Sequence, residues 1–124
     1  MPVVDNVKTF VEKWGALLDE IDADETRAKV YAFIDDLQFP KDCESLGFDM
    51  DCFNSFNAKY NYNPAKHSKK RFEKLVANCD DFCILGNAIF SQWRNYNHWS
   101  YDVKAEFETR WFRIAFKRLL ELAG

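Results

Sequence analysis

The sequence has 124 residues, a net charge of −3 and 48% hydrophobic residues, so it can fold as one domain without a disulfide or a metal. It contains only four Gly and three Pro, which disfavours turn-rich β architectures and favours helices. The first residues lack a basic stretch followed by an apolar run, and no stretch approaches the roughly 18 apolar residues of a membrane span. We therefore expect a cytoplasmic protein whose four cysteines stay reduced.

The net charge hides a division between the two halves of the chain. Residues 1–58 carry 5 Lys and Arg against 13 Asp and Glu, which gives −8, whereas residues 59–124 carry 12 against 7, which gives +5. The two sums return the net charge of −3. Such a division indicates either an interaction surface or two halves that neutralise each other once they are packed together.

Apolar residues at the start of the chain recur every three or four positions. This spacing predicts a first helix near residues 5–21. Asp22 with Glu25 resembles a capping box that opens a second helix. Pro40 is expected to end that helix, because proline lacks the amide donor, and residues 40–47 are expected to form a loop.

The middle of the chain predicts three further helices. Residues 50–60 suggest a short one, and Ser68 can cap the next. A break is expected at residues 79–81, before a helix near residues 81–98 whose first half is apolar on every side. Such a helix is typically buried at the centre of a fold, and Gly86 within it is expected to let a neighbouring helix approach closely.

A last helix is expected to begin at Ser100 or Asp102 and to carry an apolar face to the end of the chain. Short connections between these helices favour close packing of neighbours. The sequence therefore predicts an all-α fold, a compact single-domain bundle of five or six helices over residues 1–124. The helix near residues 81–98 is expected to lie at its centre.

The segment from Gln92 to Tyr101 combines polar side chains with large rings at the end of the buried helix. One interpretation is a site in which a rigid aromatic frame holds polar groups. The other is a buried hydrogen-bond network that ties the central helix to its neighbours. Arg94 and His98 lie four residues apart, and hence on one face of a helix.

The sequence Arg94-Asn95-Tyr96-Asn97-His98 resembles the Arg-Asn…His motif of HEPN domains, small helical bundles that often act as ribonucleases. The resemblance implies a site in which Arg94 and His98 of two facing protomers meet at a dimer cleft. Fewer residues separate the arginine from the histidine here than in that family. One residue rotates a helical side chain by about 100°, so this departure alters the geometry of such a cleft.

Basic residues suggest contacts to nucleic acid. Lys66, Lys70 and Lys74 recur every four residues and predict a stripe along the fourth helix. Together with Arg94 they would contact phosphates, although the chain as a whole is acidic. Large rings that would stack on unpaired bases lie nearby, at Tyr60, Tyr62, Trp93 and Trp99.

Acidic residues gather near the junction of the first two helices. They form either a solvated corner or a face that docks into a basic groove of another protein and excludes nucleic acid from it. The set comprises Asp19, Glu20, Asp22, Asp24 and Glu25.

Motifs of catalytic, metal-binding or cofactor-binding sites are scarce in this sequence. It contains no Gly-rich phosphate loop, no Cys-x-x-Cys pair and no arguable Ser/His/Asp arrangement, so we expect no cofactor and no metal, with the cysteines as core thiols. Our first hypothesis is a non-enzymatic protein-binding module. Its most concrete form is a small inhibitor or immunity-type protein, phage anti-defence or anti-CRISPR-like, that occupies the surface of a nucleic-acid-handling partner. The alternatives are single-stranded nucleic-acid binding by the basic half and a HEPN-like ribonuclease.

Overall fold

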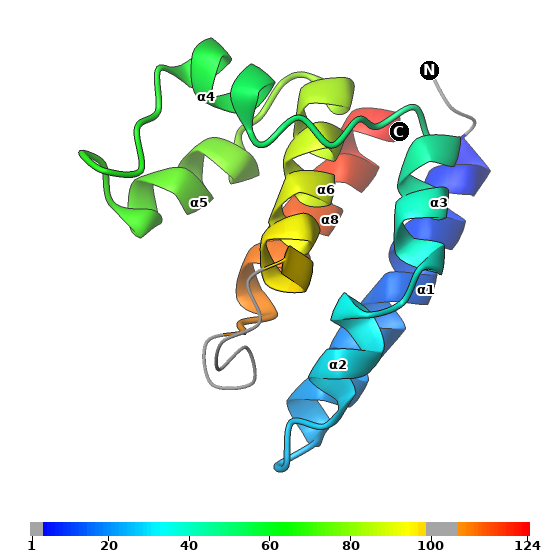
Figure 1. Cartoon of the computed structure of the whole chain (residues 1–124). Coiled ribbons are helices and arrows are strands. Elements are labelled where there is room, and N and C mark those ends of the chain that lie inside the picture. Colours follow the sequence, from blue (N-terminus) through cyan, green and yellow to red (C-terminus); the bar gives the residue numbers. More distant parts are fainter. Residues whose placement is uncertain (1–3, 99–106) are drawn as a thin grey trace.

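The computed structural model describes residues 4–98 and 107–124, and these residues form α-helices without a β-strand (Figure 1). The predicted all-α fold is confirmed. The described part of the chain holds seven helices, whereas five or six were expected. In chain order they are α1 (Val4–Ala23), α2 (Lys29–Ile34), α3 (Gln38–Ser45), α4 (Asn54–Tyr60), α5 (Lys69–Ala77), α6 (Phe82–His98) and α8 (Arg110–Ala123).

Helix α6 lies at the centre of the fold, as predicted for this segment. Figure 1 shows α4 and α5 on one side of α6 and α1 to α3 on the other. Helix α8 packs against α1, α5 and α6, so it connects the two sides. The buried side chains form one continuous cluster that is rich in aromatic rings.

Helix α1 is longer than predicted, and this moves the cap that follows it. The helix continues through Asp22, so the capping role assigned to Asp22 with Glu25 is wrong. The N-cap residue of α2 is Ala28, and the side-chain acceptor at the start of that helix comes from Asp24, four residues earlier. Asp24 Oδ1 accepts from the Thr26 N–H at 3.0 Å and its Oδ2 accepts from the Lys29 N–H at 3.0 Å, at the start of α2.

The predicted second helix is in fact two short helices, α2 and α3. They are separated by a turn in which Asp36 Oδ1 accepts from the N–H of Gln38 at 2.9 Å. Pro40 does not end a helix but occupies the third position of α3, where an amide has no intrahelical acceptor and its loss costs nothing. The loop expected at residues 40–47 is therefore wrong up to Ser45.

The boundaries of α5 follow the sequence prediction more closely. The Oγ of Ser68 accepts from the N–H of Arg71 at 3.1 Å, so the predicted cap is confirmed. Lys66 precedes the helix, which corrects the predicted stripe: only Lys70 and Lys74 lie on α5. The break expected at residues 79–81 separates α5 from α6.

Gly86 admits a close neighbour, but the neighbour is not a helix. A Cβ on Gly86 would lie 2.1 Å from Cδ1 and Cε1 of Phe48, a residue of the segment that follows α3. The Phe48 ring is 1% exposed and packs against Phe82 and Phe10, with ring centroids 5.3 and 6.3 Å apart. The missing side chain of Gly86 therefore allows this segment to lie directly on α6.

The last helix begins later than predicted. Helix α8 starts at Arg110, and residues 107–109 are not helical although Phe107 is buried. The predicted starts, Ser100 and Asp102, lie outside the described residues. Within the described part, every helix is too short or too polar to cross a membrane.

Candidate functional site

The acidic residues near the end of α1 are largely engaged by α8. Arg113 pairs with Asp19 at 2.9 Å and with Asp22 at 2.6 Å, and Thr109 Oγ1 donates to Asp22 at 2.8 Å. Burial acts to raise the pKa of Asp22, but the hydrogen bonds from Arg113 and Thr109 outweigh it and leave this pKa below its usual range. At this corner, therefore, the acidic and basic halves of the chain neutralise each other.

The other three residues of the predicted acidic face differ among themselves. Asp24 caps the start of α2 and accepts from the Thr26 hydroxyl at 2.6 Å, so its carboxylate serves the fold. Glu20 and Glu25 are exposed. The face is consequently smaller than predicted, because three of the five carboxylates already have partners within the chain.

The polar segment at the end of α6 ties that helix to the end of α2. Trp93 Nε1 donates to the backbone oxygen of Phe33 at 2.9 Å, and Asn97 Nδ2 donates to that of Ile34 at 2.9 Å. Arg94 Nη1 in turn donates to Asn97 Oδ1 at 2.6 Å. Of the two interpretations of this segment, Trp93, Arg94 and Asn97 follow the structural one.

This arrangement separates Arg94 from the lysines with which it was grouped. Arg94 faces the α2 side of α6, whereas Lys70 and Lys74 lie on α5, on the opposite side of α6 in Figure 1. Trp93 is buried and offers no face to a base, and Trp99 lies outside the described residues. His98 is exposed at the end of α6.

The four cysteines are free thiols, two of them buried. Desolvation raises the pKa of Cys43, whose neighbouring carboxylates act in the same direction, so this thiol stays protonated. Among the described residues, no three His, Cys, Asp or Glu side chains lie close enough together to hold a metal ion.

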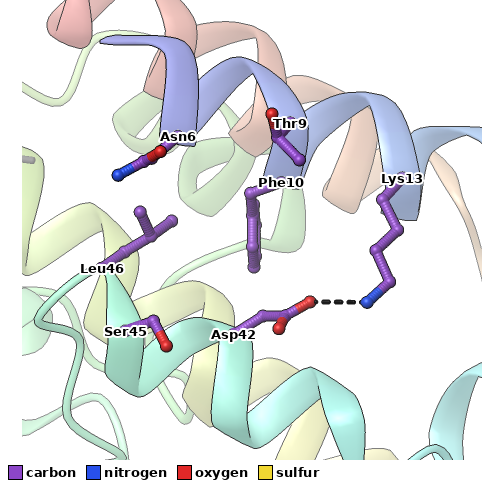
Figure 2. Close-up of a pocket in the computed structure, with 7 residues that line it drawn as sticks. All are labelled: Asn6, Thr9, Phe10, Lys13, Asp42, Ser45 and Leu46. Atoms are coloured by element: carbon purple, nitrogen blue, oxygen red, sulfur yellow. Dashed lines mark hydrogen bonds and ion pairs between the residues drawn. The ribbon is translucent and has the colours of Figure 1, made fainter. Parts of the chain in front are cut away.

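A groove of about 230 Å³ lies between α1 and α3 (Figure 2). Asp42 is its most connected residue, because it accepts from Lys13 at 2.9 Å, from Trp14 Nε1 at 3.1 Å and from Gln38 at 2.8 Å. Burial acts to raise the pKa of Asp42, but these donors outweigh it and hold the pKa below its usual range. Asp42 thus clamps α3 to α1, and its carboxylate is already fully engaged.

A second cavity, of about 260 Å³, lies between α4, α5 and α6. Its lining combines aromatic rings with primary amides: Phe53, Asn57, Tyr62, Pro64, Phe72, Gln92 and Asn95. We call it the aromatic–amide pocket. Rings of this kind provide apolar contact area, and amide groups both donate and accept hydrogen bonds.

The rings of the pocket are held in place by one another. Tyr62 stacks on Phe72 with centroids 5.0 Å apart, and Phe72 stacks on Trp111 with centroids 5.6 Å apart. The Tyr62 hydroxyl donates to the backbone oxygen of Ser68 at 3.2 Å, and Phe53 meets Phe72 at an angle of 74°. A ligand would therefore contact side chains that are already ordered, which lowers the entropic cost of binding.

Phe53 reaches the pocket through an unusual backbone. Cys52 and Phe53 have φ angles of 56° and 65°, a left-handed conformation that costs about 1–2 kcal/mol for each residue with a side chain. The N–H of Phe53 donates to Ser91 Oγ at 3.2 Å, and Ser91 Oγ donates to the backbone oxygen of Asn87 at 2.8 Å. Helix α6 thus anchors the strained residue whose ring lines the pocket.

The amides of the pocket have unused hydrogen-bonding capacity. The Oδ1 of Asn57 is buried and finds no donor within the described residues. A buried carbonyl without a donor is costly in a folded protein. Gln92 and Asn95 stand three residues apart on α6, hence on the same side, with Gln92 half-buried and Asn95 exposed.

The segment that supplies two walls of the pocket is also strongly basic. Residues 59–78, which we call the basic segment, carry 6 Lys and Arg against 1 Glu, which gives +5. The carboxylate contacts of this segment among the described residues are Lys59–Asp80 at 3.0 Å, Lys69–Glu108 at 3.3 Å and Glu73–Arg110 at 3.0 Å. Four exposed cations of the segment lie outside these pairs: Lys66, Lys70, Arg71 and Lys74.

Sequence reasoning found only part of this site. It named Tyr62 and the three lysines, and it marked Gln92 and Asn95 as part of an unusual segment. It missed Phe53 and Phe72, because apolar periodicity assigns such rings to a core, and it also missed Asn57. The run of asparagines over residues 54–63 was a usable signal, since asparagine is a poor helix former in a helical region.

Comparison with known proteins gives no further guidance: no family model, no curated protein and no solved structure matches this chain.

Proposed function

We propose that this chain binds single-stranded nucleic acid through the basic segment and the aromatic–amide pocket. One observation carries the proposal: the stretch of chain that carries four exposed cations also supplies two rings, Tyr62 and Phe72, to an ordered aromatic cavity. Proteins that bind single strands combine a positive surface, which follows the phosphates, with rings on which bases stack. The negative net charge opposes such binding only weakly at physiological salt, because screening there limits charge effects to about 8 Å.

A salt titration tests this proposal. Fluorescence anisotropy with labelled single-stranded RNA and DNA should show saturable binding at low salt. If the four free cations contact phosphates, the slope of log K against log salt should be about −3, at roughly 0.7 for each contact with a single strand. Absence of binding at low salt would refute the proposal. Shortening of the labelled RNA during the experiment would instead favour the ribonuclease alternative, with His98→Ala as its test.

A second candidate function is docking to another protein, as an inhibitor-type module against a nucleic-acid-handling partner. The observation in its favour is Leu37, a large apolar side chain that is 72% exposed in the turn between α2 and α3. Asp35 and Asp36 precede it directly, in the acidic half of the chain. An exposed apolar side chain beside carboxylates suits a partner that has an apolar pocket with a basic rim.

A test of this second candidate must substitute residues that do not stabilise the fold. Reversal of Asp19, Asp22 or Asp24 would remove ion pairs or a helix cap, so lost binding would be ambiguous. Leu37→Ser removes the exposed apolar side chain, and because Leu37 is the N-cap residue of α3, where Ser is favoured, Tm should stay equal or rise. A partner that the wild type captures and Leu37→Ser also retains would contradict docking through this turn. For either function we propose a cytoplasmic location, which suits the four free thiols.

A further inference from the structure

We infer that the aromatic–amide pocket holds one unpaired nucleobase of the bound strand, inserted between the rings of Phe53 and Tyr62 and the amides of α4 and α6. This inference rests on the proposed function and deepens it, because phosphate contacts alone do not require the pocket. Its support comes from the size, the walls and the unused hydrogen-bonding groups of the cavity.

The size of the pocket suits a small ligand. Its volume of about 260 Å³ lies just below the range of about 300–1,000 Å³ that holds drug-sized molecules. A whole nucleotide with its sugar and phosphate is larger than the base alone and strongly polar at one end. A single base therefore matches the cavity, and its sugar and phosphate remain outside.

The walls of the pocket match the two properties of a base. Aromatic rings, among them Phe53 and Tyr62, contact the flat apolar faces of a base, and stacking of this kind tolerates every base. The edge of each base carries N–H donors together with oxygen or nitrogen acceptors. Gln92 and Asn95 present amide groups on the same side of α6, and Asn57 adds a third amide to the lining.

The position of the cations places the phosphate outside the pocket. Pro64 lines the cavity, and Lys66 follows it two residues later within the same turn, where its N–H donates to the backbone oxygen of Asn63 at 3.0 Å. Phe72 lines the cavity from α5, and the positive charge of the exposed Arg71 acts on the nearby Tyr62, whereas Lys70 and Lys74 line a separate groove between α5 and α8. A base in the pocket would thus leave its backbone near Lys66 and Arg71, and Lys70 and Lys74 would contact phosphates further along the strand.

An oligomer without bases distinguishes the contribution of the base pocket to affinity from that of the phosphate contacts. We compare a labelled single-stranded DNA of about eight residues, within the usual site size, with an oligomer of equal length that carries phosphates and sugars but no bases. The intact oligomer should bind about 5- to 150-fold more tightly, which is the range for stacking of one base. Equal affinities would overturn the base pocket and leave the proposed function intact. Absence of binding by both oligomers would overturn both.

Variants then locate the base. Gln92→Ala combined with Asn95→Ala should weaken the intact oligomer about tenfold and leave the abasic oligomer unchanged, because both side chains line the pocket and neither carries a charge that would contact phosphates. Asn6→Ala, an exposed asparagine on α1, is the matched control and should change neither affinity. If the double variant binds the intact oligomer as tightly as the wild type does, the base lies elsewhere and the inference fails.

Discussion

Gly86→Ala should destabilise the protein, although alanine favours helices. A Cβ at this position would lie 2.1 Å from two carbons of the Phe48 ring, far inside van der Waals contact. The ring is 1% exposed and is held against Phe10 and Phe82, so it has no free space into which to move. Either the core becomes overpacked or the ring loses part of its burial.

The size of the effect follows from two opposing terms. Overpacking or partial loss of a buried ring costs about 2–4 kcal/mol, whereas replacing Gly by Ala in a helix contributes about 1 kcal/mol. The net loss should be about 1–3 kcal/mol, which lowers the Tm of a domain of this size by roughly 4–12 °C. Urea and thermal unfolding followed by far-ultraviolet circular dichroism measure both quantities.

The chain supplies its own control for this prediction. Gly15 lies in α1, and a Cβ there would meet nothing within 4 Å, so Gly15→Ala should raise stability by about 0.5–1 kcal/mol. The same chemical change is thus expected to have opposite signs at the two glycines. A second control is Phe48→Leu, which should cost less in the Gly86→Ala background than in the wild type. Equal or greater stability of Gly86→Ala would refute the packing described for this segment.

Three further predictions concern single residues. Asp42 has a lowered pKa, so its contribution is present above the unfolded pKa of about 3.9 and is lost as pH falls through the folded pKa. Asp42→Asn should therefore lower the free energy of unfolding by about 1 kcal/mol at pH 7, measured by urea unfolding. This difference from the wild type should disappear as the pH falls from about 5 to about 2. A difference that stays constant over this range would contradict the role of Asp42 in holding α3 to α1. Cys52→Gly removes the side chain at φ 56° and should raise the urea midpoint by the equivalent of about 0.5 kcal/mol, whereas a lower midpoint would show that the thiol matters more than the backbone. Ser68→Ala should lower stability by about 1 kcal/mol and Ser68→Asp should retain it, and equal losses in both would argue against the cap.

The long helices were predictable from the sequence because periodicity and burial act together there. Residues such as Val7, Phe10 and Trp14 recur at helical spacing, and all three are buried. Helix α6 was predicted for the same reason, from its apolar first half. The cap at Ser68 was predictable because it depends only on neighbours in sequence.

The breaks between short helices were harder to predict, because a local rule was applied at the wrong position. Proline ends a helix when it stands in the interior, but Pro40 stands in the first turn of α3, where it is tolerated. The transfer of the cap from Asp22 to Asp24 depends on where α1 ends. That end is set in part by contacts of Asp22 with Arg113, a residue 91 positions away.

The candidate site was only half predictable, because its members come from three helices and from the residues that flank α4. The lysines and Tyr62 are visible as a local cluster in the sequence. The opposite wall depends on the packing of α4 against α6, which brings Asn57 near Gln92 and Asn95. Conversely, Arg94 was predicted to contact phosphates, but its side chain donates a hydrogen bond to Asn97, which in turn joins α6 to α2.

The most direct test of the central claim compares two triple variants of equal charge. Lys66→Glu, Lys70→Glu and Lys74→Glu alter the basic segment, whereas Lys8→Glu, Lys29→Glu and Lys41→Glu alter exposed lysines of the acidic half. Each set changes the net charge from −3 by six units to −9. In anisotropy titrations with single-stranded RNA at low salt, the first set should abolish binding, and the second should weaken it only modestly through the overall charge. Equal losses in the two sets would contradict a defined phosphate-binding surface on the basic segment.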